Sequence, residues 1–263
     1  MVSRVFQDPP VIVGHRGLGR GTINGHAENT VASLLAAAEI ARWVEIDVRR
    51  TADDVLVLGH QPALHSGTPI AEASAEAAIA AGHPAVDEVL GLLPDGIGVV
   101  LDLKSALEDA LRPHGRTTAA LVAPLAVKTA ANRPLLVTSF DPAALDLLAR
   151  TAPQVSRGLI TWLWFPVGIA VAAAAGSDVQ VLSVHYGSLQ PNSIEPKIQH
   201  PGALRIIEVA HAAGLQVLTW CPDLDQAPAL LDAGVDAICV NELPATVAAL
   251  ADWRAAAHSQ PDS

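Results

Sequence analysis

Residues 44–48 read Val-Glu-Ile-Asp-Val, and this alternation of apolar and acidic side chains decides the fold. An extended strand places successive side chains on opposite faces, so the three apolar residues share one face and Glu45 and Asp47 share the other. The apolar face must be covered by helices. The two carboxylates therefore point into the interior of a sheet whose outside is packed with helices.

Short apolar runs of this kind alternate with longer helical patterns along most of the chain. Alternation of strand and helix implies parallel pairing, because a parallel connection needs a crossover. Eight such strands favour a closed (β/α)₈ TIM barrel over an open sheet. The expected strands are Val11–Gly14, Val44–Val48, Val99–Leu103, Leu135–Thr138, Gly158–Thr161, Val181–Val184, Gln216–Thr219 and Ala237–Val240. The expected helices include Thr30–Ala41, Thr117–Ala131, Pro142–Arg150, Val167–Ala175, Leu204–Ala213, Gln226–Ala233 and Pro244–Ala257.

The second strand–helix unit departs from this alternation and predicts a short insertion after strand 2. Residues 51–54 indicate a tight turn, Val55–Leu58 a short extra strand that leads to His60, and Ala71–Ala81 a small alanine-rich helix above the barrel. We expect this insertion to form part of the rim. The sequence predicts a single domain over residues 1–258 and a disordered tail at 259–263.

Composition limits the possible partners and the compartment. The 263 residues carry a formal net charge of −11 without a long Lys/Arg block, so no nucleic-acid partner is expected. Cys221 and Cys239 lack metal-type spacing, and no signal peptide is recognisable, so reduced thiols and a cytoplasmic location are expected. The uncharged stretch Gly158–Gly176 approaches bilayer-spanning length, but Pro166 interrupts it and a strand plus a helix is favoured over an integral membrane span. The oligomeric state is left open.

Acidic side chains from neighbouring strands indicate a metal site at the carboxyl ends of the strands, where barrel enzymes carry their chemistry. Asp102 and Lys104 alternate with leucines on the third expected strand, so they point inward as Glu45 and Asp47 do. Buried carboxylates this close repel one another unless something neutralises them. Mg²⁺ or Ca²⁺ suits such oxygen ligands. Salt bridges to Arg16 or Lys104 are the alternative explanation.

Two histidines accompany the carboxylates. His15 directly follows the first strand and His60 follows the extra strand, so the two imidazoles could exchange protons with a phosphodiester from opposite sides. Arg16 offers a planar fork suited to phosphate. Glu28 is expected to support His15 or Arg16, and His185, after strand six, is a candidate phosphate contact or simply a rim residue.

Aromatic residues and Lys104 leave other functions open. Trp162, Trp164 and Phe165 follow strand five and could bind an acyl chain at the mouth, which favours a lysophospholipid substrate, or could simply pack there. Lys104 could instead act as the Schiff-base nucleophile of a barrel aldolase. A catalytically silent binding barrel is the third reading.

Motifs along the whole chain resemble the glycerophosphodiester phosphodiesterase family. The similar segments are His15-Arg16-Gly17, Glu28-Asn29-Thr30, Glu45-Ile46-Asp47-Val48, Thr51 with Asp53 or Asp54, His60, Leu103-Lys104, Ser139-Phe140-Asp141, Thr219-Trp220 and residues 234–238. The resemblance implies a metal-dependent hydrolase that releases glycerol 3-phosphate and an alcohol such as choline or ethanolamine from a small glycerophosphodiester.

The same resemblance implies roles for individual residues. His15 and His60 would be the acid/base pair, Glu45 and Asp47 metal ligands, Arg16 and Lys104 phosphate contacts, and Trp220 a wall of the glycerol pocket.

The sequence departs from the family pattern at three places. Gln61 stands where the family usually has Asp after the second histidine, and Asp102 stands where the third carboxylate is commonly Glu. The related spider-venom type phospholipases D resemble this pattern with Asp there, so Asp102 remains an expected ligand. The segment from Pro62 to Pro84 is short and lacks the family's usual arginine-threonine run, which suggests a more open mouth. Gln61 motivates the silent-barrel alternative.

Overall fold

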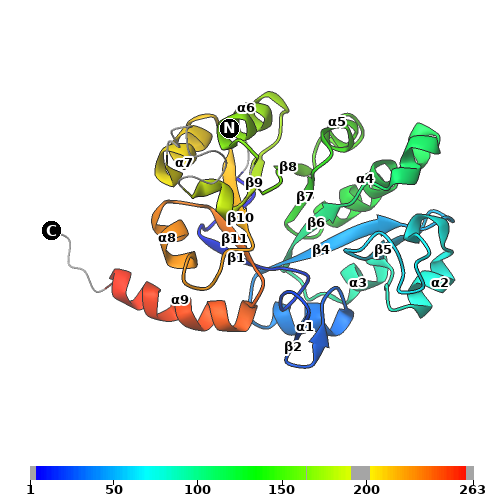
Figure 1. Ribbon diagram of the computed structural model, residues 1–263, viewed down its shortest axis with the longest axis horizontal. Helices are drawn as coiled ribbons and strands as arrows, with labels where there is room; N and C mark the ends of the chain where they lie inside the picture. The colour runs from blue at the N-terminus through cyan, green and yellow to red at the C-terminus, as the bar shows by residue number, and fades with distance from the viewer. Residues whose placement is uncertain (1–3, 164, 191–201, 259–263) are drawn as a thin grey trace.

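A computed structural model describes residues 4–163, 165–190 and 202–258, with side chains as far as residue 251. Eight parallel strands close into a barrel surrounded by helices (Figure 1). The barrel strands are β1 (Val11–Gly14), β4 (Trp43–Arg50), β6 (Gly98–Leu103), β7 (Leu135–Ser139), β8 (Ser156–Ile160), β9 (Val181–His185), β10 (Gln216–Trp220) and β11 (Ala237–Val240). The (β/α)₈ barrel expected from the sequence is confirmed.

Helices cover the outside of this barrel, and all except one of them follow the order that the sequence predicts. They are α1 (Val31–Ala38), α3 (Val86–Leu92), α4 (Thr118–Ala130), α5 (Pro142–Thr151), α6 (Val167–Gly176), α7 (Ala203–Ala212), α8 (Ala227–Asp232) and α9 (Leu243–His258). Gly214 and Gly234 follow α7 and α8 with φ of 82° and 92°, the left-handed conformation that ends helices at low cost. Among the described residues, no helix is long and apolar enough to span a bilayer. The tail predicted at residues 259–263 lies outside the described part of the chain.

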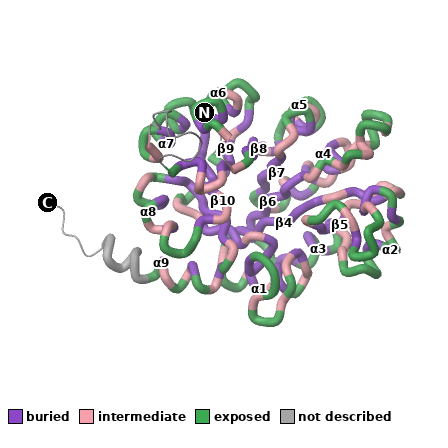
Figure 2. Tube along the Cα trace, in the orientation of Figure 1, coloured by how far each residue is buried: buried purple, intermediate pink, exposed green. Residues whose placement is uncertain are grey.

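Closure of the barrel depends on β1, which pairs in parallel with both β11 and β4. Val44, Ile46 and Val48 are fully buried in the outer core between the strands and the helices. Figure 2 shows buried strands at the centre and exposed surfaces on the surrounding helices. Glu45 and Asp47 consequently face the barrel interior, as the alternation in residues 44–48 predicts.

The lower half of the barrel interior is apolar and is closed by the N-terminal segment. Phe6 packs edge-on against Trp43 with ring centroids 5.1 Å apart, in a cluster that includes Val13, Val100 and Leu218. Gln216 Oε1 accepts hydrogen bonds from the backbone N–H groups of residues 5 and 6 at 2.7 and 3.0 Å. The polar site is therefore confined to the upper half, at the carboxyl ends of the strands.

The insertion after β4 is present, but its helices differ from the prediction. β5 (Leu56–Leu58) pairs antiparallel with β4, and the alanine-rich segment forms a short 3₁₀ turn, η1 (Ile70–Glu72), followed by α2 (Ala75–Ala80). Short two-stranded pairing of β2 (Thr22–Ile23) and β3 (His26–Ala27), together with three more 3₁₀ turns, η2 (Leu107–Leu111), η3 (His114–Arg116) and η4 (Tyr186–Leu189), completes the described elements. Helix α3, which covers the barrel here, was not predicted, because it is short and no side chain caps its N-terminus.

Arg50 forms a buried ion pair beside this insertion. The Arg50 side chain is fully buried, and its Nε donates to Asp109 Oδ1 at 2.6 Å. Asp109→Ala would leave the guanidinium buried without its charge partner, so we expect it to lower the free energy of unfolding by about 3–5 kcal/mol. Urea denaturation measures this loss.

Asp146→Ala provides the matched control for Asp109→Ala. Asp146 pairs with Arg150 on the exposed surface of α5, so its loss is expected to change stability by less than about 1 kcal/mol. Equal effects of the two substitutions would contradict the assigned importance of the Arg50 pair.

Candidate active site

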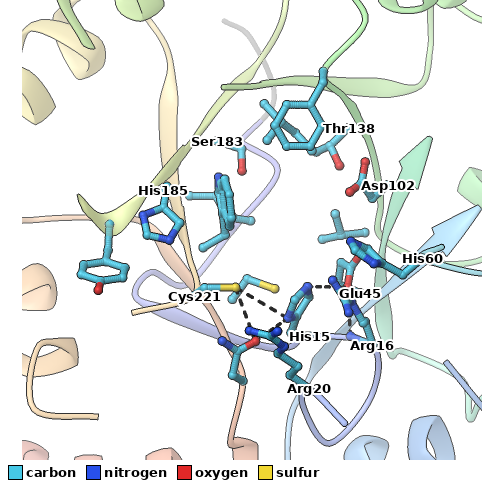
Figure 3. Close-up of a pocket in the computed structure, with 18 of the residues that line it drawn as sticks. His15, Arg16, Arg20, Glu45, His60, Asp102, Thr138, Ser183, His185 and Cys221 are labelled. Atoms are coloured by element: carbon cyan, nitrogen blue, oxygen red, sulfur yellow. Dashed lines mark hydrogen bonds and ion pairs between the residues drawn. The ribbon is translucent and has the colours of Figure 1, made fainter. Parts of the chain in front are cut away.

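A cavity of about 570 Å³ opens at the carboxyl ends of the strands. One side, here called the charged half, carries His15, Arg16, Glu45, His60, Asp102 and Lys104, with Asp47 buried beside them. The opposite side, here called the ring wall, carries Phe140, Trp162, His185, Tyr186 and Trp220. Figure 3 shows His185 across the cavity from His60 and Asp102.

Strand register brings the three predicted carboxylates together. Asp47 of β4 lies directly beside Asp102 of β6, and Glu45 is two residues earlier on the same inward face. One oxygen from each of Glu45, Asp47 and Asp102 lies within 4.8 Å of the others, and all three residues are buried. The cluster could therefore hold a metal ion.

Both predicted salt-bridge partners are also present. Lys104 Nζ lies 2.9 Å from Asp47 Oδ1 and also pairs with Asp102, while Arg16 Nε lies 3.1 Å from Asp47 Oδ2. The alternative that the sequence left open, ion pairs to Arg16 and Lys104, thus coexists with the carboxylate cluster.

The donor set fits a hard divalent cation. Three carboxylates face two cationic side chains, and the buried Oδ1 atom of Asp102 has no hydrogen-bond partner. Burial, with the nearby Asp47 and Asp102, raises the pKa of Glu45 well above its ordinary value, and burial raises the pKa of Asp102 to about 6 despite Lys104. The site is short of positive charge, and oxygen ligands of this kind suit Mg²⁺ or Ca²⁺.

The turn after β1 is shaped to hold Arg16 over the carboxylates. Arg16 has a φ of 54°, and its backbone N–H donates to Glu45 Oε2 at 2.9 Å. Gly17 follows with a φ of 97°, where a Cβ would lie 2.4 Å from Ser33 Oγ, so only glycine fits. Arg16 Nη1 donates to Glu28 Oε1 at 2.7 Å, the contact expected of Glu28.

Asn29 and Thr30 have different roles at the start of α1. Thr30 caps α1, because its Oγ1 accepts from the backbone N–H of Ser33 at 3.2 Å. Asn29 Nδ2 instead donates to Asp47 Oδ2 at 2.8 Å. Asn29 therefore fixes the orientation of a predicted metal ligand rather than capping the helix.

His15 is held by a residue that the sequence analysis missed. Its Nδ1 donates to Asn241 Oδ1 at 2.6 Å, and its Nε2 lies 3.8 Å from Glu45 Oε2 on the cavity side. Because an amide oxygen only accepts, this bond keeps the proton on Nδ1 and leaves Nε2 free to accept one. Burial and the neighbouring Arg16 lower the pKa of His15 to about 4. In the sequence, the position of Asn241 directly after the last expected strand was the signal that could have identified it as a site residue.

His60 is half-buried and lies in the charged half of the cavity. Arg49 anchors its backbone by donating from Nη2 to the carbonyl oxygen of His60 at 2.7 Å, a second contact that the sequence did not reveal. Gln61 Nε2 lies 3.4 Å from His60 Nδ1 and occupies the place of the expected carboxylate partner. Burial lowers the pKa of His60, so the imidazole is neutral near pH 7.

The remaining predicted residues fall on the ring wall or outside it. Trp220 and His185 are 4.5 Å apart between ring centroids, and His185 Nδ1 accepts from the backbone N–H of Gly187. His185 lines the cavity on the ring wall, so both its phosphate-contact role and its rim role remain predictions. Trp162 is 65% exposed at the mouth, whereas Phe165 is partly buried and packs against the outer core, which agrees with the packing alternative for Phe165. Trp164 lies outside the described residues.

Comparisons with known proteins agree with this geometry. The family model for the glycerophosphoryl diester phosphodiesterase family matches residues 15–244. A candidate glycerophosphodiester phosphodiesterase from Galdieria sulphuraria superposes with a TM-score of 0.75 at 23% identity, covering 92% of this chain and 98% of that one. A glycerophosphodiester phosphodiesterase from Parabacteroides distasonis superposes with a TM-score of 0.73 at 22% identity, covering 93% and 98%.

A third solved structure carries a ligand. It is a phosphodiesterase from Oleispira antarctica in complex with the product sn-glycerol-3-phosphate, with a TM-score of 0.69 at 23% identity, covering 95% of this chain and 100% of that one. No curated protein matches the chain. At these identities the solved structures show the shared fold, and the family match over residues 15–244 shows more: the chain belongs to the glycerophosphoryl diester phosphodiesterase family of phosphoric diester hydrolases.

Proposed function

We propose that the protein hydrolyses a glycerophosphodiester to glycerol 3-phosphate and an alcohol. The observation that carries this proposal is the convergence of Glu45, Asp47 and Asp102 on the cavity that also contains His15 and His60. In the net reaction the P–O bond to the alcohol breaks, water supplies the oxygen that joins phosphorus, and a proton passes to the alcohol. The product bound to the Oleispira antarctica phosphodiesterase is the phosphate ester expected here.

The hydrogen bonds on the two imidazoles support different roles for them. His15 Nε2 is free to accept a proton from the attacking water, because Nδ1 is protonated toward Asn241. Gln61 Nε2 lies at His60 Nδ1, so His60 Nε2 is the nitrogen left to the substrate, and as an imidazolium, the form that the nearby Asp47 carboxylate favours, it can donate a proton. We therefore assign His15 as the general base and His60 as the general acid for the leaving alcohol.

Positive charge near the carboxylates supports a phosphate site. Arg16 and Lys104 both line the cavity and would bind the non-bridging phosphoryl oxygens. Glu45, Asp47 and Asp102 would hold one Mg²⁺ or Ca²⁺, which supplies charge neutralisation at the phosphoryl group when bound.

Electrostatics argue against the aldolase alternative. Burial alone would lower the pKa of Lys104, but Asp102 and Asp47 outweigh it and raise the pKa above its ordinary value. A Schiff-base lysine needs the opposite shift, because only the neutral amine is a nucleophile.

The exposed indole of Trp162 is the observation that favours the second candidate, lysophospholipase D-type activity.

A panel of glycerophosphodiesters and lysophospholipids, assayed separately with Mg²⁺ and Ca²⁺, tests the proposal. We expect glycerol 3-phosphate to be released from glycerophosphodiesters only when one of these cations is present. Absence of phosphodiester cleavage with every substrate and cation would refute the proposed activity and favour a silent binding barrel. Lysophospholipid turnover that is unchanged in Trp162→Ala would exclude an acyl-binding role for Trp162.

A further inference from the structure

Five rings form a continuous wall along one side of the cavity. Trp162 stacks on Phe140 with centroids 4.2 Å apart, and Phe140 and Trp220 form a T-shaped pair with centroids 6.2 Å apart. Trp220 contacts His185 at 4.5 Å, and His185 contacts Tyr186 at 4.5 Å. These rings come from the carboxyl ends of four consecutive barrel strands, β7 to β10, so the barrel itself holds the wall in place.

The Asp223 carboxylate lies at the Tyr186 end of the ring wall. Tyr186 Oη donates to Asp223 Oδ2 at 3.3 Å, and Asp223 lines the same cavity. Burial lowers the pKa of His185, so its ring is neutral near pH 7 and does not oppose a cation. The ring wall therefore combines aromatic faces with one negative charge at its Tyr186 end, whereas the Lys104 ammonium lies 5.5 Å from the Phe140 centroid at the other end.

Three kinds of substituent could lie against such a wall, and their chemistry separates them. A glycerol moiety could pack its C–H groups against Trp220, as the family resemblance implies, but its hydroxyls need hydrogen-bond partners that ring faces do not supply. An acyl chain would desolvate the Asp223 carboxylate without compensating it. A quaternary ammonium has no N–H to satisfy, spreads its charge over methyl groups and is attracted by both aromatic faces and a nearby carboxylate.

Given the hydrolysis proposed above, we propose that the ring wall and Asp223 bind the quaternary ammonium of a choline leaving group, which makes choline phosphodiesters the preferred substrates. The cavity of about 570 Å³ is large enough for a ligand that lies between its two sides. Trp162 lies at the outer end of the ring wall, where its indole stacks on Phe140 and is otherwise exposed to solvent. The phosphate lies against the charged half, and the trimethylammonium group lies against the rings.

Kinetics with three esters test the charge preference directly. The esters are glycerophosphocholine, glycerophosphoethanolamine and the 3,3-dimethylbutyl ester, which has the shape of the choline ester without its charge. We expect the lowest KM for glycerophosphocholine, and we expect Asp223→Asn to raise that KM by about fivefold while the KM of the neutral ester stays constant. Trp162→Ala is expected to raise the KM for glycerophosphocholine by a similar factor with little change in kcat.

Asp225→Asn is the matched control, because Asp225 is exposed on the same loop and does not belong to the cavity lining. It removes the same charge and is expected to leave all three KM values unchanged. Equal KM values for the charged and neutral esters, or an equal response of both to Asp223→Asn, would overturn the proposal. An effect of Asp225→Asn as large as that of Asp223→Asn would overturn it as well.

Two further measurements separate this proposal from the proposed function and identify the source of the choline group. Broadening of the N-methyl proton signal of free choline by the wild-type protein, and its loss in Trp162→Ala, would support the ring wall even if no ester were cleaved. Cleavage of all three esters with equal KM would refute the ring wall and leave the phosphodiesterase activity intact. Comparison of glycerophosphocholine with lysophosphatidylcholine shows whether the water-soluble or the lipid form is turned over, and loss of the choline preference in both would overturn the assignment.

Discussion

Replacement of His15 by alanine is expected to lower kcat by at least about a hundredfold, the lower end of what general acid–base catalysis contributes. His15 Nε2 is the basic nitrogen that faces the cavity, and the hydrogen bond from Nδ1 to Asn241 fixes its tautomer. Steady-state hydrolysis of a glycerophosphodiester measures the loss. His114→Ala is the control, because His114 lies in the short turn η3 away from the cavity lining.

His60→Ala should cause a loss of similar size, but one that depends on the leaving alcohol. A general acid matters most when the departing oxygen is strongly basic, so the loss should shrink with an acidic leaving group such as 4-nitrophenol. The loss in His15→Ala should persist with both substrates. Dependence on the leaving group in His15→Ala, and its absence in His60→Ala, would reverse the two assignments, while wild-type rates in either variant would remove that histidine from the mechanism.

The strands and the acidic cluster could be predicted because they depend on a local pattern. Alternation over residues 44–48 fixes which side chains point inward, and parallel pairing of neighbouring strands then places Asp47 beside Asp102. Both inferences require only the periodicity of a strand and the order of strands in a barrel. The same reasoning placed Lys104 correctly, although it could not decide between an ion pair and a phosphate contact.

Contacts that form only when the barrel closes could not be predicted from local sequence patterns. Asn241 lies 226 residues from His15 along the chain, and the two meet only because β1 pairs with β11. The closure of the barrel floor by Phe6 depends in the same way on the distant Gln216. The sequence left acyl-chain binding and packing open for Phe165, because the order of residues after β8 does not reveal which side chain packs against the core.

Removal of the divalent cation by a chelator is expected to reduce activity by about a thousandfold or more, since a metal ion contributes several kcal/mol to stabilising phosphoryl transfer. Re-addition of Mg²⁺ or Ca²⁺ should restore the rate. Glu45→Gln should weaken cation binding measured by calorimetry, whereas Asp87→Asn, an exposed position at the start of α3, should not. Full activity after exhaustive chelation would contradict a metal-dependent reaction.

Proton competition gives this prediction a second readout that is independent of turnover. Burial raises the pKa of Asp102 to about 6 and also raises the pKa of Glu45, so both carboxyls retain protons at mildly acidic pH when no cation is bound. A cation must displace those protons, so its affinity should fall as the pH is lowered from 8 to 5.5. A ligand that binds only the folded state stabilises it more at a given concentration when its affinity is higher. Added Ca²⁺ should therefore raise the Tm more at pH 8 than at pH 5.5. A larger rise at the acidic pH would mean that the buried carboxylates are not the ligands.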